Sequence, residues 1–424
     1  MSQDVRPDAT AGGRASPGPL PGDLADALDV LSSGAAQVLP EGALAEKLRT
    51  ARSEGRPLRV KLGIDPSGAQ LTLGHAVVLR KLRQFQDLGH LAVLIVGDFT
   101  GQVGDPSGKT NTRSALSAEQ TAENSASYFD QLMQILDSSK VEVRRNSEWL
   151  GTMTMTDVLR EARHLTVAKL LERDDFARRY RDNLPISLVE FMYPLLQGLD
   201  SVAVAADVEL GGTDQTYNNL VGRELQRAHG QEPQVVLTVP LLEGLDGVEK
   251  MGKSLDNWVA ITEPPAEQFG KLMSVPDFIV GRYARLCTAL HPREVDALEE
   301  EVQAGGTRAN AAKRRMAREV VTLYHGDDAA RAAEEAFDAR FKRREVPTDV
   351  PVHALPDGDL VHVPVVLVDA GLAPSRSAAR RFIDDGAVRL DGERLPAGAY
   401  DLPHADLTGR VLQRGRRHAV RLTD

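Results

Sequence analysis

Two short turns of the sequence carry side chains that could bind phosphate. The first contains Lys250, Lys253 and Ser254 around a glycine, and the second ends in Gly74 and His75, directly after a strand-like segment. Fixed cations stabilise the negative charge that develops on phosphate oxygens during group transfer. The two turns are therefore predicted to hold a nucleoside triphosphate from both sides, the geometry that adenylate-forming chemistry requires.

The turn that ends in Gly74 and His75 connects a predicted strand to the start of a predicted helix. Gly63 and Asp65 close the strand-like run, and Thr72, Gly74 and His75 open the following helical pattern. A helix start presents unpaired N–H groups, and a glycine there lets a base or a ribose approach the backbone closely. Taken alone, such a segment is more often a purely structural turn.

A glycine-rich loop further along the chain looks at first like a phosphate-binding P-loop. Gly104 and Gly108 enclose three residues, however, where the P-loop has four, so this interpretation fails. Asp105, Lys109 and Arg113 remain as polar candidates on the loop. A solvated loop with ordinary surface charges is the simpler interpretation of this segment in isolation.

A third set of polar residues lies in an otherwise apolar segment. Tyr193, Gln197 and Asp200 are spaced at i, i+4 and i+7, which places them on one face of a helix. That face is either exposed to solvent or forms a polar pocket, and the spacing leaves both possibilities open. After a further strand, Gly211 indicates close backbone approach, and Asp214 is placed to accept from a ribose hydroxyl or an amine.

Strands that alternate with helices must position these residues. Such alternation predicts an α/β fold, a Rossmann-like parallel sheet with helices on both faces and a ligand at the carboxyl ends of the strands. A helical lead-in over 24–53 is expected first, and charged helical patterns continue beyond Pro264. The expected strands are 58–65, 91–97, 141–145, 202–209 and 234–239, and the expected helices between them include 76–88, 118–136 and 215–227.

The length of 424 residues predicts two or three domains. Pro, Gly, Ser and Asp dominate the first segment, which is predicted to be a disordered tail and not a signal peptide. The predicted parts are the tail at 1–22, a Rossmann-like catalytic domain at 23–245, an α-helical domain with the lysine turn at 246–346, a linker at 347–360, and a small α+β domain at 361–424 with a hairpin turn at Asp391-Gly392.

Charge is distributed unevenly along the chain. The formal net charge is −10, yet from Gly371 onward ten arginines face seven acids, a local excess of +3. Phosphate backbones respond to local charge, so the terminal domain remains a candidate for nucleic-acid binding. Cys287 is the only cysteine, which excludes an intrachain disulfide and fits a reducing cytoplasm. It is expected to be buried and inert, and no apolar stretch is long enough for a membrane span.

In combination, these motifs resemble bacterial tyrosyl-tRNA synthetase, a class I enzyme with HIGH and KMSKS signatures. The resemblance runs from about residue 24 to the end of the chain, and residues 375–392 are similar to an S4 RNA-binding domain. It implies that tyrosine and ATP form tyrosyl-adenylate, after which the tyrosyl group moves to the terminal ribose of tRNA(Tyr). It also implies a cytoplasmic homodimer, Mg²⁺ that arrives with ATP, and no protein-bound metal.

The resemblance assigns roles to residues of this chain. Tyrosine would be bound by Asp105, Tyr193, Gln197, Asp200 and Gln215. ATP would be bound by Gly63, Asp65, Gly74, His75, Gly211, Asp214 and Lys253. Catalytic charge stabilisation would come from Thr72, His75, Lys109, Arg113, Lys250, Lys253 and Ser254. RNA would contact Arg376, Arg380 and Arg381.

Two positions depart from the family pattern. Thr72 replaces the first histidine of HIGH, which keeps a hydroxyl donor but loses the imidazole. In the better-known branch of the family a tyrosine stands two positions before Gly63, where this chain has Lys61. A second contact to the substrate hydroxyl is therefore not implied at this position, and Lys61 is a candidate to pair with an acid instead.

Three other functions are compatible with parts of the pattern. Tryptophanyl specificity shares the fold, although a carboxylate at Asp200 and the S4-like segment favour tyrosine. A non-catalytic RNA-binding protein would explain Thr72 but not the two lysines of the KMSKS-like turn. A P-loop NTPase is disfavoured by the glycine spacing. Amino-acid-dependent exchange of pyrophosphate into ATP separates all of these possibilities.

Overall fold

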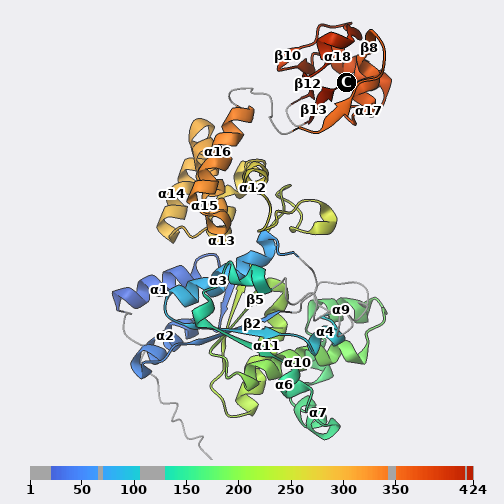
Figure 1. The fold of residues 1–424 in the computed structure, drawn as a ribbon. Coiled ribbons are helices and arrows are strands. Elements are labelled where there is room, and N and C mark those ends of the chain that lie inside the picture. Colours follow the sequence, from blue (N-terminus) through green and yellow to red (C-terminus); the bar gives the residue numbers. More distant parts are fainter. Residues whose placement is uncertain (1–20, 65–69, 106–128, 342–349, 416–417, 424) are drawn as a thin grey trace, which may run out of the picture. The chain divides into compact units, whose positions relative to one another are not determined.

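The computed structural model describes residues 21–64, 70–105, 129–341, 350–415 and 418–423, and places them in two compact units (Figure 1). The first unit contains the described residues up to Glu263 together with Lys271–Tyr324. The second contains Pro264–Gly270 and the described residues from His325 onward.

The first unit is built on a six-stranded sheet in the order β1-β6-β5-β2-β3-β4. All neighbouring strands are parallel except β1, which runs antiparallel to β6. The predicted parallel sheet is confirmed, and the antiparallel edge strand was not anticipated. The strands are β1 (Gln37–Leu39), β2 (Arg59–Ile64), β3 (Leu91–Val96), β4 (Val141–Arg145), β5 (Val208–Gly212) and β6 (Val235–Val239).

Two sequence-based expectations about this sheet were wrong. The helical lead-in over 24–53 is interrupted, because β1 lies within it and pairs with β6. The strand expected at 202–209 begins only at Val208, because the preceding helix continues to Ala203 and the chain then turns through Ala205, whose φ is 47°. In both places, tertiary pairing and packing override the local apolar pattern.

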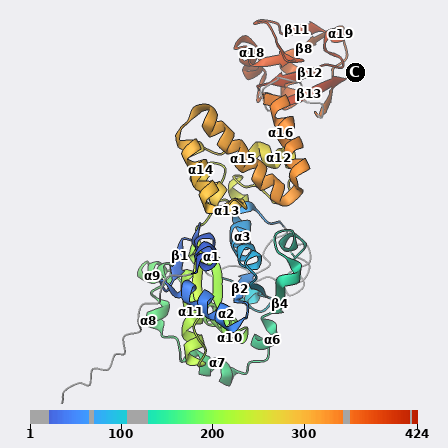
Figure 2. The ribbon, with the colours of Figure 1, turned by 90° about the vertical axis from the view of Figure 1, so that its left-hand side faces the viewer.

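Helices cover both faces of the sheet (Figures 1 and 2). Helix α3 (Leu73–Asp87) packs on one face, and α10 (Leu188–Ala203) and α11 (Thr216–Ala228) pack on the other. The strand order reverses between β2 and β5, which are hydrogen-bonded neighbours. In doubly wound sheets a ligand binds in the crevice at the carboxyl ends of the strands at this reversal.

The first unit contains further helices. Charged helical patterns predicted beyond Pro264 are confirmed as α14 and α15, while the predicted helix at 118–136 falls partly outside the described residues. The helices are α1 (Gly22–Ser32), α2 (Ala43–Glu54), α4 (Thr100–Val103), α6 (Ser147–Leu150), α7 (Met155–Ala162), α8 (Val167–Leu170), α9 (Asp174–Arg181), α13 (Val280–Cys287), α14 (Pro292–Gln303) and α15 (Gly306–His325), with 3₁₀ turns η1 (Ser138–Lys140), η2 (Thr213–Gln215), η3 (Lys253–Leu255) and η4 (Asp277–Ile279).

Helix α12 (Pro265–Leu272) begins in the second unit, which also contains α16 (Asp327–Phe341) and a small α+β core. Its sheet has the order β10-β9-β12-β13-β7, and β11 pairs with β8. The remaining elements are β7 (Val352–Ala354), β8 (Leu360–His362), α17 (Val363–Asp369), α18 (Arg376–Asp384), β9 (Val388–Leu390), β10 (Glu393–Arg394), β11 (Asp401–Pro403), α19 (His404–Leu407), β12 (Val411–Arg414) and β13 (His418–Thr423).

The predicted hairpin of this unit is confirmed. Asp391 and Gly392 join β9 to β10 with φ values of 48° and 86°, the left-handed backbone that a two-residue turn with Asp-Gly adopts. Strand β7 lies inside the interval 347–360 that was expected as a linker, and it pairs with β13.

Two further expectations can be compared with the described residues. None of the helices in these parts of the chain is long and apolar enough to cross a membrane. Cys287 is buried, and desolvation raises the pKa of its thiol to about 12. The thiol is therefore protonated at neutral pH, as expected for an inert buried cysteine.

Candidate active site

A short antiparallel pairing brings the two predicted turns together. Thr72, directly before α3, forms a bridge with Ala260. The N–H of Leu73 donates to the carbonyl oxygen of Val259 at 2.9 Å. Since Ala260 follows the lysine turn by only six residues, this bridge holds the turn beside the start of α3.

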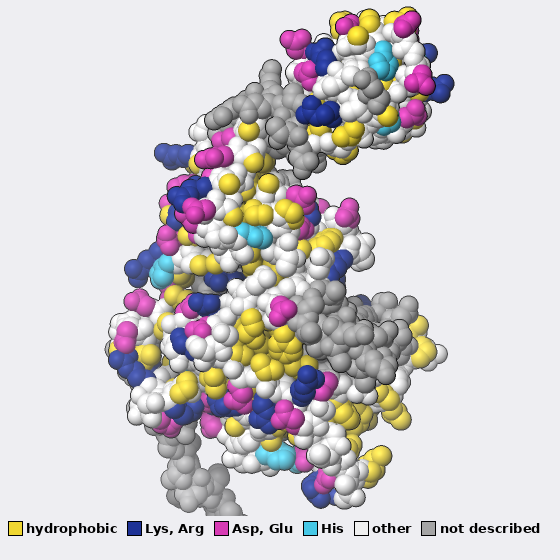
Figure 3. Space-filling model, viewed as in Figure 1, with side chains coloured by type: hydrophobic (Ala, Val, Ile, Leu, Met, Phe, Trp, Pro, Cys, Tyr) yellow, Lys and Arg dark blue, Asp and Glu magenta, His cyan; other side chains and the backbone are white. Residues whose placement is uncertain are grey.

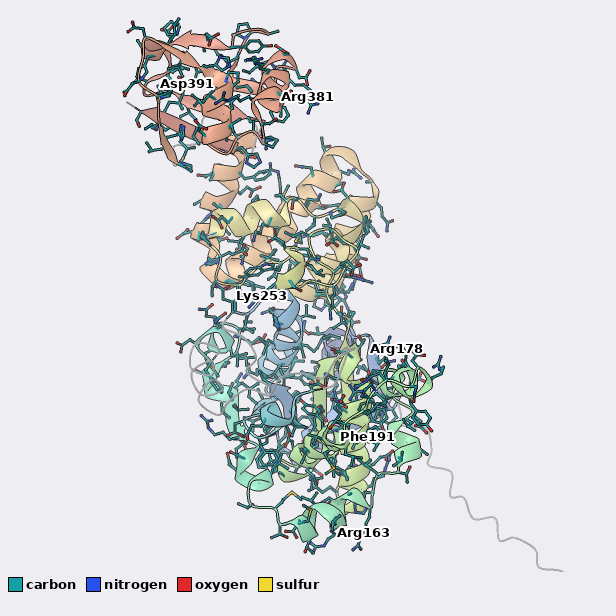
Figure 4. All side chains as sticks on the ribbon, turned by 90° about the vertical axis from the view of Figure 1, so that its right-hand side faces the viewer. Arg163, Arg178, Phe191, Lys253, Arg381 and Asp391 are labelled. Atoms are coloured by element: carbon teal, nitrogen blue, oxygen red, sulfur yellow. The ribbon has the colours of Figure 1, made fainter. Side chains whose placement is uncertain are left out.

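The lysine turn lies against that helix start. Nζ of Lys253 donates to the carbonyl oxygen of Gln70 at 2.8 Å (Figure 4). A Cβ added to Gly74 would lie 3.6 Å from Cβ of Met251, so the turn passes directly over this glycine. Ser254 is exposed on η3, next to Lys253.

Asn257 anchors the lysine turn, a role that sequence reasoning missed. Its Oδ1 accepts from the N–H of Gly252 at 2.9 Å, and its Nδ2 donates to Oδ2 of Asp246 at 2.7 Å. Asn257 is buried, so these bonds are protected from competition with water. The hydrogen bond from Asn257 is also the largest cause of a lowered pKa at Asp246.

His75 is oriented by Thr72. The Nδ1 atom of His75 accepts from the N–H of Thr72 at 3.2 Å and lies 2.8 Å from its Oγ1. Because Nδ1 accepts, a neutral imidazole carries its proton on Nε2. Part of His75 is exposed, yet desolvation by surrounding protein and then the charge of Lys253 lower its pKa. His75 is therefore a neutral Nε2–H donor, and Thr72 sets its tautomer.

Two acidic residues meet at the edge next to the lysine turn. Nε2 of Gln215 donates to Oδ2 of Asp105 at 2.8 Å, and the Arg173 guanidinium lies 4.0 Å from Oδ1 of the same carboxylate. Desolvation, followed by the like charge of Asp105, raises the pKa of Asp214, while Lys250 lowers it. These electrostatic effects indicate that Asp105, Asp214 and Lys250 lie in one region. Arg173 lies there too, and the sequence analysis did not identify it.

Asp200 is buried on α10 and is held by two donors. Its Oδ1 accepts from Nε1 of Trp149 at 2.9 Å, and its Oδ2 lies 3.4 Å from Nδ2 of Asn146. Burial raises the pKa of Asp200 to about 7, against the lowering effects of Lys61, Trp149 and Asn146. The polar face predicted on this helix therefore lies within the protein at Asp200 and is not simply exposed to solvent.

Gln197 and Tyr193 lie on the same helix. Nε2 of Gln197 donates to Oε1 of Glu209 at 3.1 Å, and Nζ of Lys61 donates to the backbone oxygen of Gln197 at 2.9 Å. Lys61 and Glu209 form a buried ion pair, so Lys61 does pair with an acid. Tyr193 is buried one turn before Gln197.

The glycines lie where strands end. No described atom comes within 4 Å of the position that a Cβ on Gly63 would occupy, at the carboxyl end of β2. A Cβ on Gly211, near the end of β5, would lie 2.8 Å from Cβ of Gln215. Gly63 therefore leaves the backbone accessible, whereas Gly211 is required for the close packing that places Gln215.

Some predicted residues do not belong to this cluster. Asp65, Lys109 and Arg113 lie outside the described residues. Arg376, Arg380 and Arg381 are exposed on α18 of the second unit, where Figure 4 labels Arg381. The Arg380 guanidinium lies 5.5 Å from the Tyr400 ring centroid. Within the described segments, no group of three or more His, Cys, Asp or Glu side chains is arranged to hold a metal ion.

The missed residues differ in how far the sequence could have revealed them. Asn146 directly follows β4, and polar residues at the carboxyl end of a buried strand are candidates in an open α/β sheet. Trp149, Arg173 and Asn257 lie in turns or short helices without such a signal. Their contacts depend on how separate segments pack.

Comparison with known proteins identifies the class that this fold and site define. The family described as tRNA synthetases class I (W and Y) matches residues 53–342, and the S4 domain matches residues 363–401. The chain belongs to the class I tRNA synthetases of the W and Y family.

Two relatives that are similar over nearly the whole chain are tyrosine–tRNA ligases. The tyrosine–tRNA ligase of Moorella thermoacetica is 48% identical over 400 residues, which cover 94% of this chain and 96% of that protein. The tyrosine–tRNA ligase of Acidithiobacillus ferrooxidans is 48% identical over 399 residues, which cover 94% of this chain and 97% of that protein.

Solved structures share the fold. A truncated mitochondrial tyrosyl-tRNA synthetase of Aspergillus nidulans has a TM-score of 0.61 at 21% identity and covers 75% of this chain and 94% of that one. The tyrosyl-tRNA synthetase of Archaeoglobus fulgidus in complex with L-tyrosine has a TM-score of 0.58 at 22% identity. The match covers 73% of this chain and 99% of that one. The predicted class I catalytic fold followed by an S4 domain is confirmed.

Asn257→Ala is expected to loosen the lysine turn. The substitution leaves the N–H of Gly252 and a carboxylate oxygen of Asp246 without their partner, and each lost hydrogen bond costs about 1 kcal/mol. Hydrogen exchange at the Gly252 amide should become faster. Ser254→Ala is the control, since within the described residues no hydrogen bond involves the Ser254 side chain. Unchanged exchange in Asn257→Ala would contradict the anchoring role.

Proposed function

We propose that this chain attaches tyrosine to tRNA(Tyr) in two steps, through tyrosyl-adenylate. The observation that carries the proposal is the convergence of the His75 helix start and the lysine turn beside the sheet. The reversal of strand order lies between β2 and β5, and Asp200 and Gln197 approach it on α10. The relatives named tyrosine–tRNA ligase support the choice of amino acid.

The proposed amino-acid site uses the buried carboxylate of Asp200. An ionised carboxylate only accepts hydrogen bonds, so it suits the hydroxyl donor of a tyrosine side chain. A phenylalanine ring has no donor, and the indole N–H of tryptophan lies at a different position on its ring system. Gln197, Asp105 and Gln215 would face the amine, and Tyr193 would complete the pocket. Because Gln215 already bonds Asp105, these two groups are oriented before substrate arrives.

The proposed nucleotide site lies between the strand ends and the lysine turn. Gly63, Asp65, Gly74, Gly211 and Asp214 would line the adenosine. His75 would donate to a phosphate through Nε2, in the tautomer that Thr72 sets. The pyrophosphate would be held by Lys109, Arg113, Lys250, Lys253 and Ser254.

The chemistry needs charge stabilisation more than proton transfer. An oxygen of the tyrosine carboxylate attacks the α-phosphorus of ATP, and the bond to the pyrophosphate oxygen breaks. The nucleophile is already ionised, so no general base is required. In the second step a ribose hydroxyl of the tRNA attacks the activated carbonyl, the bond between that carbonyl carbon and the phosphate oxygen of AMP breaks, and the hydroxyl proton passes to solvent as AMP leaves. Cations placed before the reaction lower the barrier because they need not reorganise.

We also propose a cytoplasmic setting and Mg²⁺ that enters bound to ATP. Mg²⁺ is commonly bound by substrate phosphates with one or two carboxylates. The metal would neutralise phosphate charge.

The decisive experiment is pyrophosphate exchange into ATP with single amino acids. Tyrosine should stimulate the exchange, and tryptophan or phenylalanine should not. Stimulation by tryptophan alone would overturn the tyrosine assignment while keeping the class. Salt-dependent RNA binding without exchange for any amino acid would favour a non-catalytic protein.

The activity with tyrosine should fall as the pH drops below about 7. The pKa of Asp200 is raised to about 7 by burial, so below that pH the carboxyl is protonated and becomes a weaker acceptor for the phenol. The measurement is kcat/KM for tyrosine against pH. A profile that stays flat down to about pH 5 would contradict this role.

Asp200→Asn should separate stability from activity. A carboxyl with a higher pKa in the folded than in the unfolded chain destabilises the fold increasingly as the pH rises above its unfolded-state pKa of about 4. The full penalty is present above its folded-state pKa. At about pH 8 the substitution should therefore raise the unfolding temperature, while kcat/KM for tyrosine falls about a hundredfold. Thermal unfolding and exchange kinetics measure both. Loss of both together would indicate a structural role only.

Lys253→Ala should lower adenylate formation by about 10²- to 10³-fold. Lys253 is exposed, so the unfolding temperature should hardly change. Single-turnover formation of tyrosyl-adenylate and thermal unfolding check the two parts. An equal loss of stability and rate would show that the lysine acts through the fold.

Removal of residues 350–424 should leave adenylate formation intact and weaken tRNA charging. The deletion takes away the whole sheet that carries α18, including β7. With it goes the segment from Gly371 onward, in which ten arginines face seven acids and which can attract phosphate. Charging kinetics at several salt concentrations are the measurement. Equal charging by the full and shortened chains would contradict the RNA role.

We further propose that the protein forms a homodimer. Large apolar side chains are exposed on the first unit: Met155 (73%) and Leu159 (61%) on α7, and Leu188 (79%) and Val189 (52%) at the start of α10. Figure 3 shows apolar side chains at the lower right, where Figure 1 places α7. Such exposure favours an interface.

The dimer proposal predicts a mass in solution of twice the 46.0 kDa chain. Leu188→Asp should shift the light-scattering mass toward the single chain, since a charge buried at an interface is costly. Val248→Asp is a control, because Val248 is equally exposed, at 75%, in the loop before the lysine turn. A monomeric unaltered protein would refute the dimer.

A further inference from the structure

A buried ion pair underlies the proposed amino-acid pocket. Lys61 of β2 and Glu209 of β5 are register partners at the reversal of strand order, with Nζ 2.9 Å from Oε1. Their side chains are 0% and 1% exposed. Desolvation of two charges often outweighs their attraction, and apolar residues of similar size are frequently as stable. Stability is therefore a weak reason for this pair, so its neighbours must be considered.

Every proton of the Lys61 ammonium is directed at the protein. Nζ donates to the backbone oxygen of Gln197 at 2.9 Å, to Oγ of Ser201 at 2.8 Å and to Glu209. An ammonium has three donors, so none is left for a bound amino acid. Lys61 can influence the substrate only through the residues that it holds.

Glu209 holds the same face of this helix. Its Oε1 accepts from Nε2 of Gln197 at 3.1 Å, and its Oε2 accepts from Oγ of Ser201 at 3.0 Å and from Gln234. The pair thus contacts Gln197 twice, at the backbone through Lys61 and at the side-chain amide through Glu209. Such support fixes a binding side chain before substrate arrives.

The pair also acts on Asp200, which lies between Gln197 and Ser201 on α10. The groups that influence Asp200 are Trp149, Asn146, Lys61 and Glu209. Against the rise caused by burial, Lys61 is the largest opposing influence on the pKa of Asp200, while Glu209 raises it by less. The pair as a whole therefore favours the ionised carboxylate.

We propose that Lys61 and Glu209 are positioning residues that orient Gln197 and keep Asp200 in its hydrogen-bond-accepting form, and so control affinity for a phenolic amino acid without touching it. This inference rests on the proposed function. It assigns a role to the position where the better-known branch of the family has a tyrosine. In this chain Asp200 would bind the phenol hydroxyl, and Lys61 would keep Asp200 ionised from its buried position in the core.

The test is the double variant Lys61→Met/Glu209→Gln, which removes both charges at similar volume and leaves neither unpaired. Exchange kinetics are measured with tyrosine and with ATP as the varied substrate, from about pH 6 to about pH 9. The KM for tyrosine at neutral pH should rise about tenfold or more. The KM for ATP should change by less than about twofold. The acid limb of kcat/KM for tyrosine should move up by about one pH unit.

Lys47→Met/Asp207→Asn is the matched control. Lys47 and Asp207 are 3.5 Å apart with side chains 10% and 9% exposed, and Asp207 lies just before β5, at the opposite end of the strand from the proposed site. This variant should lose stability without moving the KM for tyrosine or the acid limb. If both double variants changed the pH profile alike, the effect would be general and the proposal would fail.

Three further outcomes complete the test. A folded Lys61→Met/Glu209→Gln variant with unchanged KM for tyrosine and an unchanged acid limb overturns the role of the pair. If that variant does not fold, Ser201→Ala replaces it, because it removes one hydrogen bond from each partner without changing a charge. A rise of about threefold in the KM for tyrosine is then expected, and no rise overturns the proposal. Absence of tyrosine-stimulated exchange in the unaltered protein overturns the proposed function itself.

Discussion

The site depends on one short backbone pairing, between the residues before α3 and those after the lysine turn. The Thr72–Ala260 bridge and the Leu73–Val259 hydrogen bond join segments almost 190 residues apart in the sequence. Without this pairing the lysines would be ordinary exposed cations. With it, Lys253 lowers the pKa of His75 and Lys250 acts on Asp214. Backbone geometry thus converts separate charges into one electrostatic site.

Charged side chains are buried beside the proposed amino-acid pocket, and their desolvation costs free energy. Asp200, Lys61 and Glu209 are each at most 3% exposed, and a folded core rarely contains so many charges without a functional reason. The hydrogen bonds of Trp149, Ser201 and Gln197 offset part of the desolvation. The proposed amino-acid site supplies such a reason, since selectivity for a polar group requires a buried partner for that group.

Sequence patterns predicted the elements whose signals are local. The apolar run of β3 and the Asp391-Gly392 turn are each specified by neighbouring residues, since burial on both faces and left-handed turn geometry leave direct signatures. The lead-in over 24–53 failed because β1 is stabilised by β6, nearly two hundred residues later. Strand β5 was placed too early because α10 continues through residues that favour strands equally well.

The sequence by itself determined the class of chemistry, because the combination of these motifs and their order along the chain are specific, although each turn taken alone is more often structural. It also placed Tyr193, Gln197 and Asp200 on one helix face. Only the tertiary structure decided that Thr72 orients His75, that Asn257 anchors the lysine turn and that Lys61 pairs with Glu209. Each of these contacts joins a side chain to a partner chosen by folding, and a hydrogen bond across packed segments leaves no periodic trace in the chain.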